Sequence, residues 1–273
     1  MRTAHVGAQH PPSTTTPDVT GQDDATTVEA PISSFRSTCA VCGADGAFVL
    51  DGASIRESFR CKSCKAHLRD QGQARLILGR YARDGATSVA ALAEEPEFAA
   101  LDIYEPGTIG PFRTFLRPLP GYVSSEYRPA GEVAQAEGDD RGEDLMALSF
   151  PSSSFDLVIT SDVFEHVRRP LVGFAEVHRV LRPGGAHVFS IPVTHPMRET
   201  TTARVDTSGE EDVHILEPRY HNDKHLVYND FGADLLGALD ALGFTTEAVQ
   251  FESNDSQTSK LLTFCSVKEP GRR

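Results

Sequence analysis

The sequence FDLVITSDVFEHV at residues 155–167, followed by EVHRVLRPGG at residues 176–185, decides the fold prediction. Its first part is a short apolar run with polar neighbours, which predicts a buried β-strand over Phe155–Ser161. A helix is expected over Leu171–Leu181, and the Pro-Gly-Gly sequence that follows is a strong helix terminator. A second apolar run predicts a strand over Ala186–Pro192. Strand, helix and strand in this order are typical of a parallel sheet.

The same alternation of short apolar runs and helical stretches extends to both sides and predicts an α/β fold. Two further strands are expected at Ala99–Tyr104 and Tyr122–Ser125. Two last strands, at Thr246–Phe251 and Leu261–Val267, are expected to form an antiparallel pair joined by the polar loop Glu252–Lys260. Helices are expected at Gln73–Arg83 and Asp230–Leu242.

Length and composition set the broad class of the protein. The chain has 273 residues and a net charge of −13, and no stretch reaches the ~18 apolar residues of a membrane span. The N-terminus has no apolar signal-peptide core, so we expect a cytoplasmic protein under reducing conditions, with no membrane partner. The predicted organisation has three parts: a disordered tail at 1–33, a small module at 34–84 that ends in a helix, and a main domain at 85–273 with an insertion at about 193–228.

Two C-x-x-C pairs, Cys39 with Cys42 and Cys61 with Cys64, are separated by eighteen residues. Four thiolates at this ribbon-type spacing predict a tetrahedral Zn²⁺ site, and with every position filled the zinc would be structural. A redox role for the C-x-x-C pairs is the alternative. Cys265 lies in a predicted strand and is expected to be a small buried residue.

From about Phe98 to Val267 the chain resembles the class I S-adenosylmethionine-dependent methyltransferases, with a type 11-like methyltransferase domain. The motifs that carry this resemblance are GEDLMALSFP at residues 142–151, FDLVITSDVFEHV and EVHRVLRPGG, in that order. The resemblance implies a Rossmann-like sheet, mostly parallel with an antiparallel last strand, preceded here by the zinc-binding module. It also implies that S-adenosylmethionine lies across the carboxyl ends of the strands.

The resemblance implies roles for individual residues. Glu126 matches the acidic residue that accepts hydrogen bonds from the ribose hydroxyls, and Asp144 matches the acceptor for the adenine amino group. Leu145 matches the neighbour whose backbone N–H faces the adenine ring. Ser161 and Asp162 lie where the strand end meets the methionine part of the cofactor.

The glycine-rich turn departs from the family pattern. The sequence LDIYEPGTIGPF at residues 101–112 contains only two glycines, Gly107 and Gly110. Either Asp102 or Glu105 could be the acidic residue of the motif, and Tyr104 and Gly107 are expected to contact the cofactor beside it. Gly107 would let the backbone approach the cofactor closely.

The methyl acceptor needs a base if it is a hydroxyl, and histidine is the usual choice near neutral pH. His166 and His195 are the candidate catalytic residues because both follow predicted strand ends. Further residues of the insertion could line the acceptor pocket, although no tight ligand spacing among them indicates a second metal site: His214, Tyr220, His221, His225 and Tyr228.

We expect methyl transfer to an oxygen or nitrogen of a small-molecule natural product or a sugar. A subgroup of bacterial methyltransferases with four N-terminal cysteines has segments similar to YEPGTIGP and to His221–Phe244, and its members resemble natural-product or polysaccharide enzymes. One alternative is a zinc-ribbon RNA methyltransferase, because Phe35–Arg83 has nine Lys and Arg against four Asp and Glu. The acidic main domain makes nucleic acid the less favoured partner. The other alternative is a binding protein that kept the fold without turnover.

Overall fold

The computed structural model describes residues 34–50, 56, 58–107, 109–129, 141–221, 224–250 and 261–271. These residues belong to one compact unit, Pro31–Arg273. The predicted tail at 1–33, Phe251 and the predicted loop Glu252–Lys260 lie outside the described residues. Within the described ranges, no helix combines the length and the hydropathy needed to cross a membrane.

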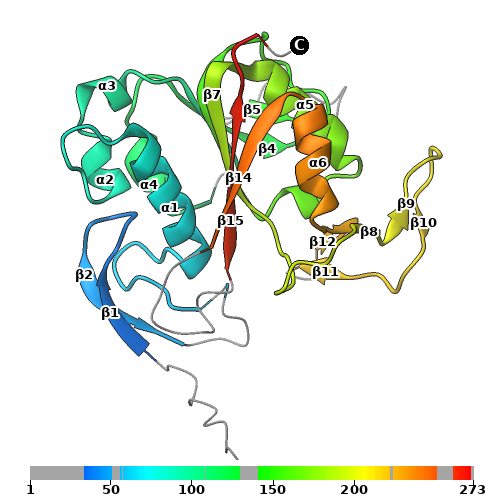
Figure 1. Ribbon diagram of the computed structural model, residues 1–273, viewed down its shortest axis with the longest axis horizontal. Coiled ribbons are helices and arrows are strands. Elements are labelled where there is room, and N and C mark those ends of the chain that lie inside the picture. Colours follow the sequence, from blue (N-terminus) through cyan, green and yellow to red (C-terminus); the bar gives the residue numbers. More distant parts are fainter. Residues whose placement is uncertain are drawn as a thin grey trace, which may run out of the picture. The chain divides into compact units, whose positions relative to one another are not determined.

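A seven-stranded sheet forms the centre of the structure, in the order β14-β15-β7-β6-β3-β4-β5. Figure 1 shows this sheet nearly edge-on, with β14 and β15 in front. Neighbouring strands from β5 to β7 are parallel, whereas β15 is antiparallel to both β7 and β14. The parallel part has the Rossmann order, in which the first strand lies between the second and the fourth. The predicted mostly parallel sheet with an antiparallel last strand is therefore confirmed. The strands are β3 (Ile103–Pro106), β4 (Tyr122–Tyr127), β5 (Arg141–Glu143), β6 (Phe155–Ser161), β7 (Leu181–Ser190), β14 (Phe244–Gln250) and β15 (Leu262–Lys268).

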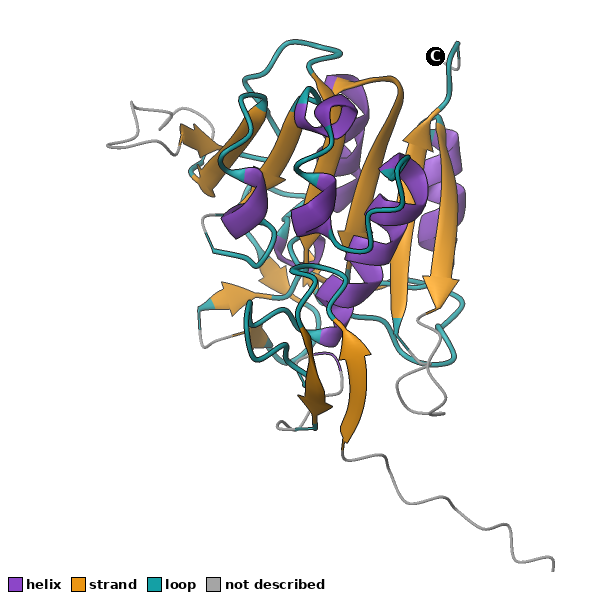
Figure 2. Ribbon diagram, turned by 90° about the vertical axis from the view of Figure 1, so that its left-hand side faces the viewer, coloured by secondary structure: helices purple, strands orange, loops and turns teal. Residues whose placement is uncertain are grey.

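Helices cover both faces of this sheet, and Figure 2 looks onto the face that carries α1. Residues of β6 alternate between two hydrophobic cores: Leu157 and Ile159 enter the first, and Val158 enters the second. Burial on both faces explains why this strand is a nearly continuous apolar run. The helices of the first face are α1 (Leu68–Tyr81), α2 (Val89–Leu92), α3 (Pro96–Ala99) and α4 (Arg113–Leu116), and those of the second are the 3₁₀ turn η2 (Phe164–His166), α5 (Pro170–Val180) and α6 (Asp234–Ala241).

Several element boundaries differ from the sequence prediction for local reasons. The strand expected from Ala99 begins only at Ile103, because Pro96 starts the short helix α3. Helix α1 begins at Leu68, before the expected Gln73, because His67 and Asp70 form a capping box. Strand β7 begins at Leu181, which pairs with Phe155 across a register shift.

The cysteine-bearing segment folds as a hairpin of β1 (Ser34–Thr38) and β2 (Asp45–Val49), which the sequence analysis did not predict. Cys39 and Cys42 lie in its connection. The backbone N–H groups of Val89 and Ala90 donate to the carbonyls of Ala40 and Val41, at 2.8 and 2.9 Å, which fixes this connection against α2. Residues of the hairpin, of α1 and of the sheet share the first core, which is therefore continuous from the cysteines to β6.

The insertion contains three two-stranded antiparallel pairs. The helix that was expected to begin at Asp230 begins only at Asp234. Asn229 and Asp230 instead form a strand that pairs with Thr202 and Ala203. The Tyr228 N–H donates to the Glu165 carbonyl at 2.7 Å, which attaches the insertion to η2. The strands of the insertion are β8 (Thr202–Ala203), β9 (Val205–Asp206), β10 (Val213–His214), β11 (Tyr220–His221), β12 (His225–Leu226) and β13 (Asn229–Asp230).

The contact between α1 and β15 gives a testable prediction. A Cβ added at Gly72 would lie 2.7 Å from Cγ2 of Thr263, whose side chain is only 2% exposed. Gly72→Ala should lower the free energy of unfolding by about 1–3 kcal/mol, because this methyl has no room to move. Gly79→Ala in the same helix is the control: its Cβ would meet no atom within 4 Å, so a gain of up to about 1 kcal/mol is expected. Urea unfolding measures both variants. A Gly72→Ala variant as stable as the wild type would contradict the close contact between Gly72 and Thr263.

Candidate functional site

Four acidic residues lie along one edge of the sheet, which we call the carboxyl edge. Glu105 and Glu126 lie in the last two residues of β3 and β4, Asp144 directly follows β5, and Asp162 directly follows β6. These four strands are adjacent and parallel, so their carboxyl ends share one edge. Ligands of open α/β sheets bind at this edge.

Asp102 does not join this group. It directly precedes β3, at the opposite edge of the sheet, where its carboxylate accepts a 2.7 Å hydrogen bond from Arg182. The choice that the sequence left open between Asp102 and Glu105 therefore falls on Glu105. Tyr104 is completely buried in the second core, and its hydroxyl shares a 2.8 Å hydrogen bond with Ser125.

Glu105 is 8% exposed and accepts a 2.7 Å hydrogen bond from the Tyr122 hydroxyl. Burial raises the pKa of Glu105 to about 7, with a smaller opposing effect from Tyr122 and Arg113 and an added increase from Asp70. The two glycines of the turn after Glu105 meet steric requirements. Gly107 has φ +108°, and a Cβ at Gly110 would lie 3.1 Å from Glu105 Oε1.

A hollow of about 660 Å³ adjoins this turn. Gly110 and Arg113 are among its lining residues, and Arg113 also donates to the Ser124 hydroxyl of β4. The hollow therefore lies beside the Glu105 end of the carboxyl edge. Its lining consists of Ile109, Gly110, Arg113, Thr114, Arg117 and Pro118.

The acidic residues at the ends of β4 and β5 differ in exposure. The side chain of Glu126 is 52% exposed and lies 3.6 Å from the Arg128 guanidinium. Asp144 is 6% exposed, and its Oδ1 accepts the Met146 N–H at 2.8 Å, which fixes the carboxylate in a tight turn. Leu145 is 7% exposed and packs in the second core.

Asp162 has a left-handed backbone, with φ +51°, a conformation that non-glycine residues adopt rarely and often at functional sites. Its carboxylate pairs with Arg56, lies 3.4 Å from Arg69, and accepts a 2.8 Å hydrogen bond from the Ser190 hydroxyl. The neighbouring Ser161 hydroxyl donates to the Gln73 side chain at 2.8 Å. The sequence analysis missed Arg56 and Arg69, and the basic excess of their segment was the only signal for them.

His166, a predicted catalytic residue, lies in a cluster with Glu165 and His221. Its Nδ1 hydrogen bonds with the Leu226 carbonyl at 2.8 Å, and its Nε2 lies 3.1 Å from Nδ1 of His221. Glu165 Oε1 lies 3.7 Å from His166 Nε2 and 3.6 Å from His221 Nδ1. The hairpin of β11 and β12 thus brings His221 and Leu226 onto η2.

Glu165 is 1% exposed, and neither carboxylate oxygen accepts a hydrogen bond from another residue of the described chain. Burial raises its pKa to about 8, and the Asp162 carboxylate adds to this effect, whereas Arg56 and Arg69 oppose it. Burial lowers the pKa of His166, with a smaller opposing effect from its bond to Leu226. The sequence analysis did not single out Glu165, because nothing local marks a glutamate that is buried by a later segment.

The other histidines and tyrosines of the prediction are not part of this cluster. His195 is exposed after β7, and His214 is exposed in β10. The His225 ring lies 5.6 Å from the His166 ring. The Tyr228 hydroxyl donates to Asp212 at 2.8 Å, and Tyr220 is exposed.

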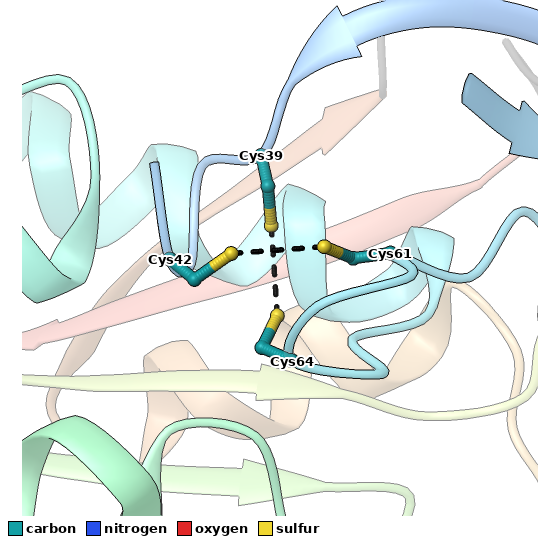
Figure 3. Close-up of side chains that lie close together, drawn as sticks. All are labelled: Cys39, Cys42, Cys61 and Cys64. Carbon is teal, nitrogen blue, oxygen red and sulfur yellow. Dashed lines mark hydrogen bonds between the residues drawn. The ribbon is translucent and has the colours of Figure 1, made fainter. Parts of the chain in front are cut away.

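The four predicted metal-binding cysteines come together. Their sulfurs point toward a common centre (Figure 3), with Cys39 and Cys64 3.7 Å apart and Cys42 and Cys61 3.6 Å apart. A tetrahedral ion with Zn–S bonds of about 2.3 Å requires sulfurs about 3.8 Å apart, so the four residues fit zinc. Hydrogen bonds from the Cys64 thiol, the Cys42 N–H and Gln71 lower the pKa of Cys39 below its usual range. The hydrogen bond with Cys39 raises the pKa of Cys64, and burial raises the pKa of Cys42.

A family model described as a methyltransferase domain matches residues 126–189. Two relatives, both described as an uncharacterized methyltransferase, come from Mycobacterium avium (strain 104) and Mycolicibacterium paratuberculosis (strain ATCC BAA-968 / K-10). Each is 42% identical over 79 residues, which are 29% of this chain and 30% and 29% of theirs. The chain thus spans under a third of the length of these relatives.

Among solved structures, an S-adenosylmethionine-dependent methyltransferase from Mesorhizobium loti is 24% identical, with a TM-score of 0.41. The similarity covers 67% of this chain and 97% of that one. The segment similar to the methyltransferase domain model thus runs from the end of β4 to the end of β7.

Glu105 gives a pH-dependent prediction. The pKa of Glu105 is about 7 in the folded protein, against an ordinary value of 4.5. The carboxyl group therefore stabilises the fold most below pH 4.5 and loses this contribution as the pH rises through 7. Glu105→Gln should remove this slope, so its stability relative to the wild type should improve from pH 5 to pH 8, by at most about 3 kcal/mol. Urea unfolding at four pH values measures this. Glu247→Gln, an exposed position in β14, should show no such trend, and parallel pH profiles for wild type and Glu105→Gln would contradict the assignment.

Proposed function

We propose that the protein is an S-adenosylmethionine-dependent methyltransferase that methylates an oxygen or nitrogen of a small-molecule natural product or a sugar. The observation that carries the proposal is the row of acidic residues on the carboxyl edge, within and beside the segment that matches a methyltransferase domain. Carboxylates there can accept hydrogen bonds from the ribose hydroxyls and amino groups of the cofactor.

Three of the four acidic residues of the carboxyl edge have a part of the cofactor to hold in this proposal. Glu126 would accept from the ribose hydroxyls, Asp144 from the adenine amino group, and the Leu145 backbone would face the ring. The turn at Gly107 lets the chain approach the cofactor closely. Asp162 lies at the end expected for the methionine part, beside the cationic side chains of Arg56 and Arg69, which suit a carboxylate.

The cofactor supplies a methyl group that is already activated, so the protein has mainly to align the acceptor and manage its proton. His166 is the candidate to receive that proton, because its bond to the Leu226 carbonyl leaves Nε2 as the available nitrogen. The insertion that contains His221 and Tyr228 covers η2. It is therefore the segment that we expect to recognise the acceptor.

A structural zinc ion at Cys39, Cys42, Cys61 and Cys64 is the second part of the proposal. Two pairs of sulfurs are 3.7 and 3.6 Å apart, and all four lie within 4.8 Å of one another, so they would fill all positions of the ion. The metal would fix the hairpin and the turn before α1, which both belong to the first core. Two of the nine basic side chains of this segment, Arg56 and Arg69, pair with Asp162 inside the protein, which weakens the argument for RNA from its charge.

Cofactor binding is tested by calorimetric titration with S-adenosylmethionine and S-adenosylhomocysteine. We expect micromolar binding, which Glu126→Ala and Asp144→Ala should each weaken about 10-fold or more, since each removes one or two hydrogen bonds to the ligand. Asp102→Asn, at the opposite edge, is the control and should bind like the wild type. A folded wild-type protein without affinity for either compound would refute the methyltransferase proposal and favour a binding protein.

The zinc site is tested by measuring metal content. Cys64→Ser should contain one metal equivalent fewer than the wild type and unfold at a lower temperature, because a structural zinc contributes directly to folding stability. Cys265→Ala is the control, because this buried cysteine lies in β15, outside the cluster. Equal metal content in wild type and Cys64→Ser would rule out the site.

A further inference from the structure

The cluster of Glu165, His166 and His221 has the dimensions of a metal site. Its three ligand atoms lie 3.1, 3.6 and 3.7 Å apart. A point equidistant from all three is about 2.0 Å from each, within the range of about 2.0–2.2 Å for bonds from nitrogen and carboxylate oxygen to zinc. The cluster is one of two groups in the described part of the chain in which three or more such ligand atoms lie this close together, and the other is the cysteine site.

The tautomer of His166 suits a ligand. The Leu226 carbonyl can only accept a hydrogen bond, so Nδ1 of His166 carries the hydrogen, and the Nε2 lone pair faces Glu165 and His221. Histidines that bind metals usually donate their other ring N–H to a carbonyl or carboxylate in this way.

Glu165 provides the second, independent observation. Its carboxylate is almost completely buried, and no other described residue donates a hydrogen bond to either oxygen. The imidazoles of His166 and His221 lie 3.7 and 3.6 Å from its Oε1, and the cationic Arg56 and Arg69 pair with Asp162. A buried carboxylate without a donor is costly, and a cation held between the three groups would remove that cost.

We propose that Glu165, His166 and His221 bind a divalent first-row transition-metal ion, such as Zn²⁺ or Fe²⁺. Two imidazoles and one carboxylate are the ligand set that these ions accept while keeping open positions. Those positions can take water or an oxygen of another molecule. If the proposed function holds, that molecule is the methyl acceptor, because Glu165 lies three residues beyond Asp162 on the carboxyl edge. The metal would then acidify the bound hydroxyl, and His166, with Nε2 as a ligand, would hold the metal instead of receiving the proton itself.

The test is an equilibrium Zn²⁺ titration of the full chain, with competition by a chromophoric chelator, that counts the binding sites. The wild type should bind two ions per chain, one at the cysteines and one at the new site. Glu165→Gln and His221→Ala should each keep the first ion and bind the second at least about 100-fold more weakly. Mg²⁺, which prefers oxygen ligands, should not compete.

His214→Ala is the matched control, since His214 is an exposed histidine of the same insertion outside the cluster, and it should still bind two ions. Near-UV circular dichroism confirms that each variant is folded, and His221→Ala, at a half-buried position, remains informative if Glu165→Gln does not fold. A single site in the wild type, or two unchanged sites in His221→Ala, would overturn the proposal. Because the readout needs no S-adenosylmethionine, its failure is distinguishable from failure of the proposed function.

Discussion

The parallel pairing of β3 with β6 and β4 determines where the acidic residues of the carboxyl edge lie. Ile103 is opposite both Tyr122 and Leu157, so the three strands run in the same direction and end at the same edge. The pairing separates Asp102 from Glu105, although they are only three residues apart, because one precedes the strand and the other ends it. The backbone register, rather than the spacing of charges in the sequence, therefore assembles the acidic row.

Helix α1 connects the cysteine segment to this row. The buried Gln73 amide donates to the Thr160 carbonyl of β6 at 3.1 Å and accepts from the Ser161 hydroxyl. Buried polar groups need such partners, and here the partners are the last residues of β6. Gln71, two residues earlier, donates to the sulfur of Cys39 at 3.2 Å. One turn of helix thus contacts both the cysteine cluster and the end of the strand that carries Asp162.

The sequence predicted those features that depend on local patterns. The strand Phe155–Ser161 has its predicted limits, and the C-x-x-C spacing correctly indicated that four sulfurs would meet. The hairpin of β1 and β2 was missed because its alternation is weak. The cluster at Glu165 was missed because His221 lies 55 residues later in the chain, and only the tertiary packing of the insertion brings the two together.

The segment from Ser161 to His166 is held from two directions. Arg56, Arg69 and Gln73 contact its first residues from the N-terminal part of the chain. The insertion contacts its last residues through His221, Leu226 and Tyr228. Asp162 has an unfavourable backbone conformation, which persists only when the surroundings determine it strongly. Contacts from both sides provide that determination, so the two segments that distinguish this chain from a bare α/β sheet converge on the same short turn. It follows that changes in either segment can alter the geometry of the site without touching a ligand.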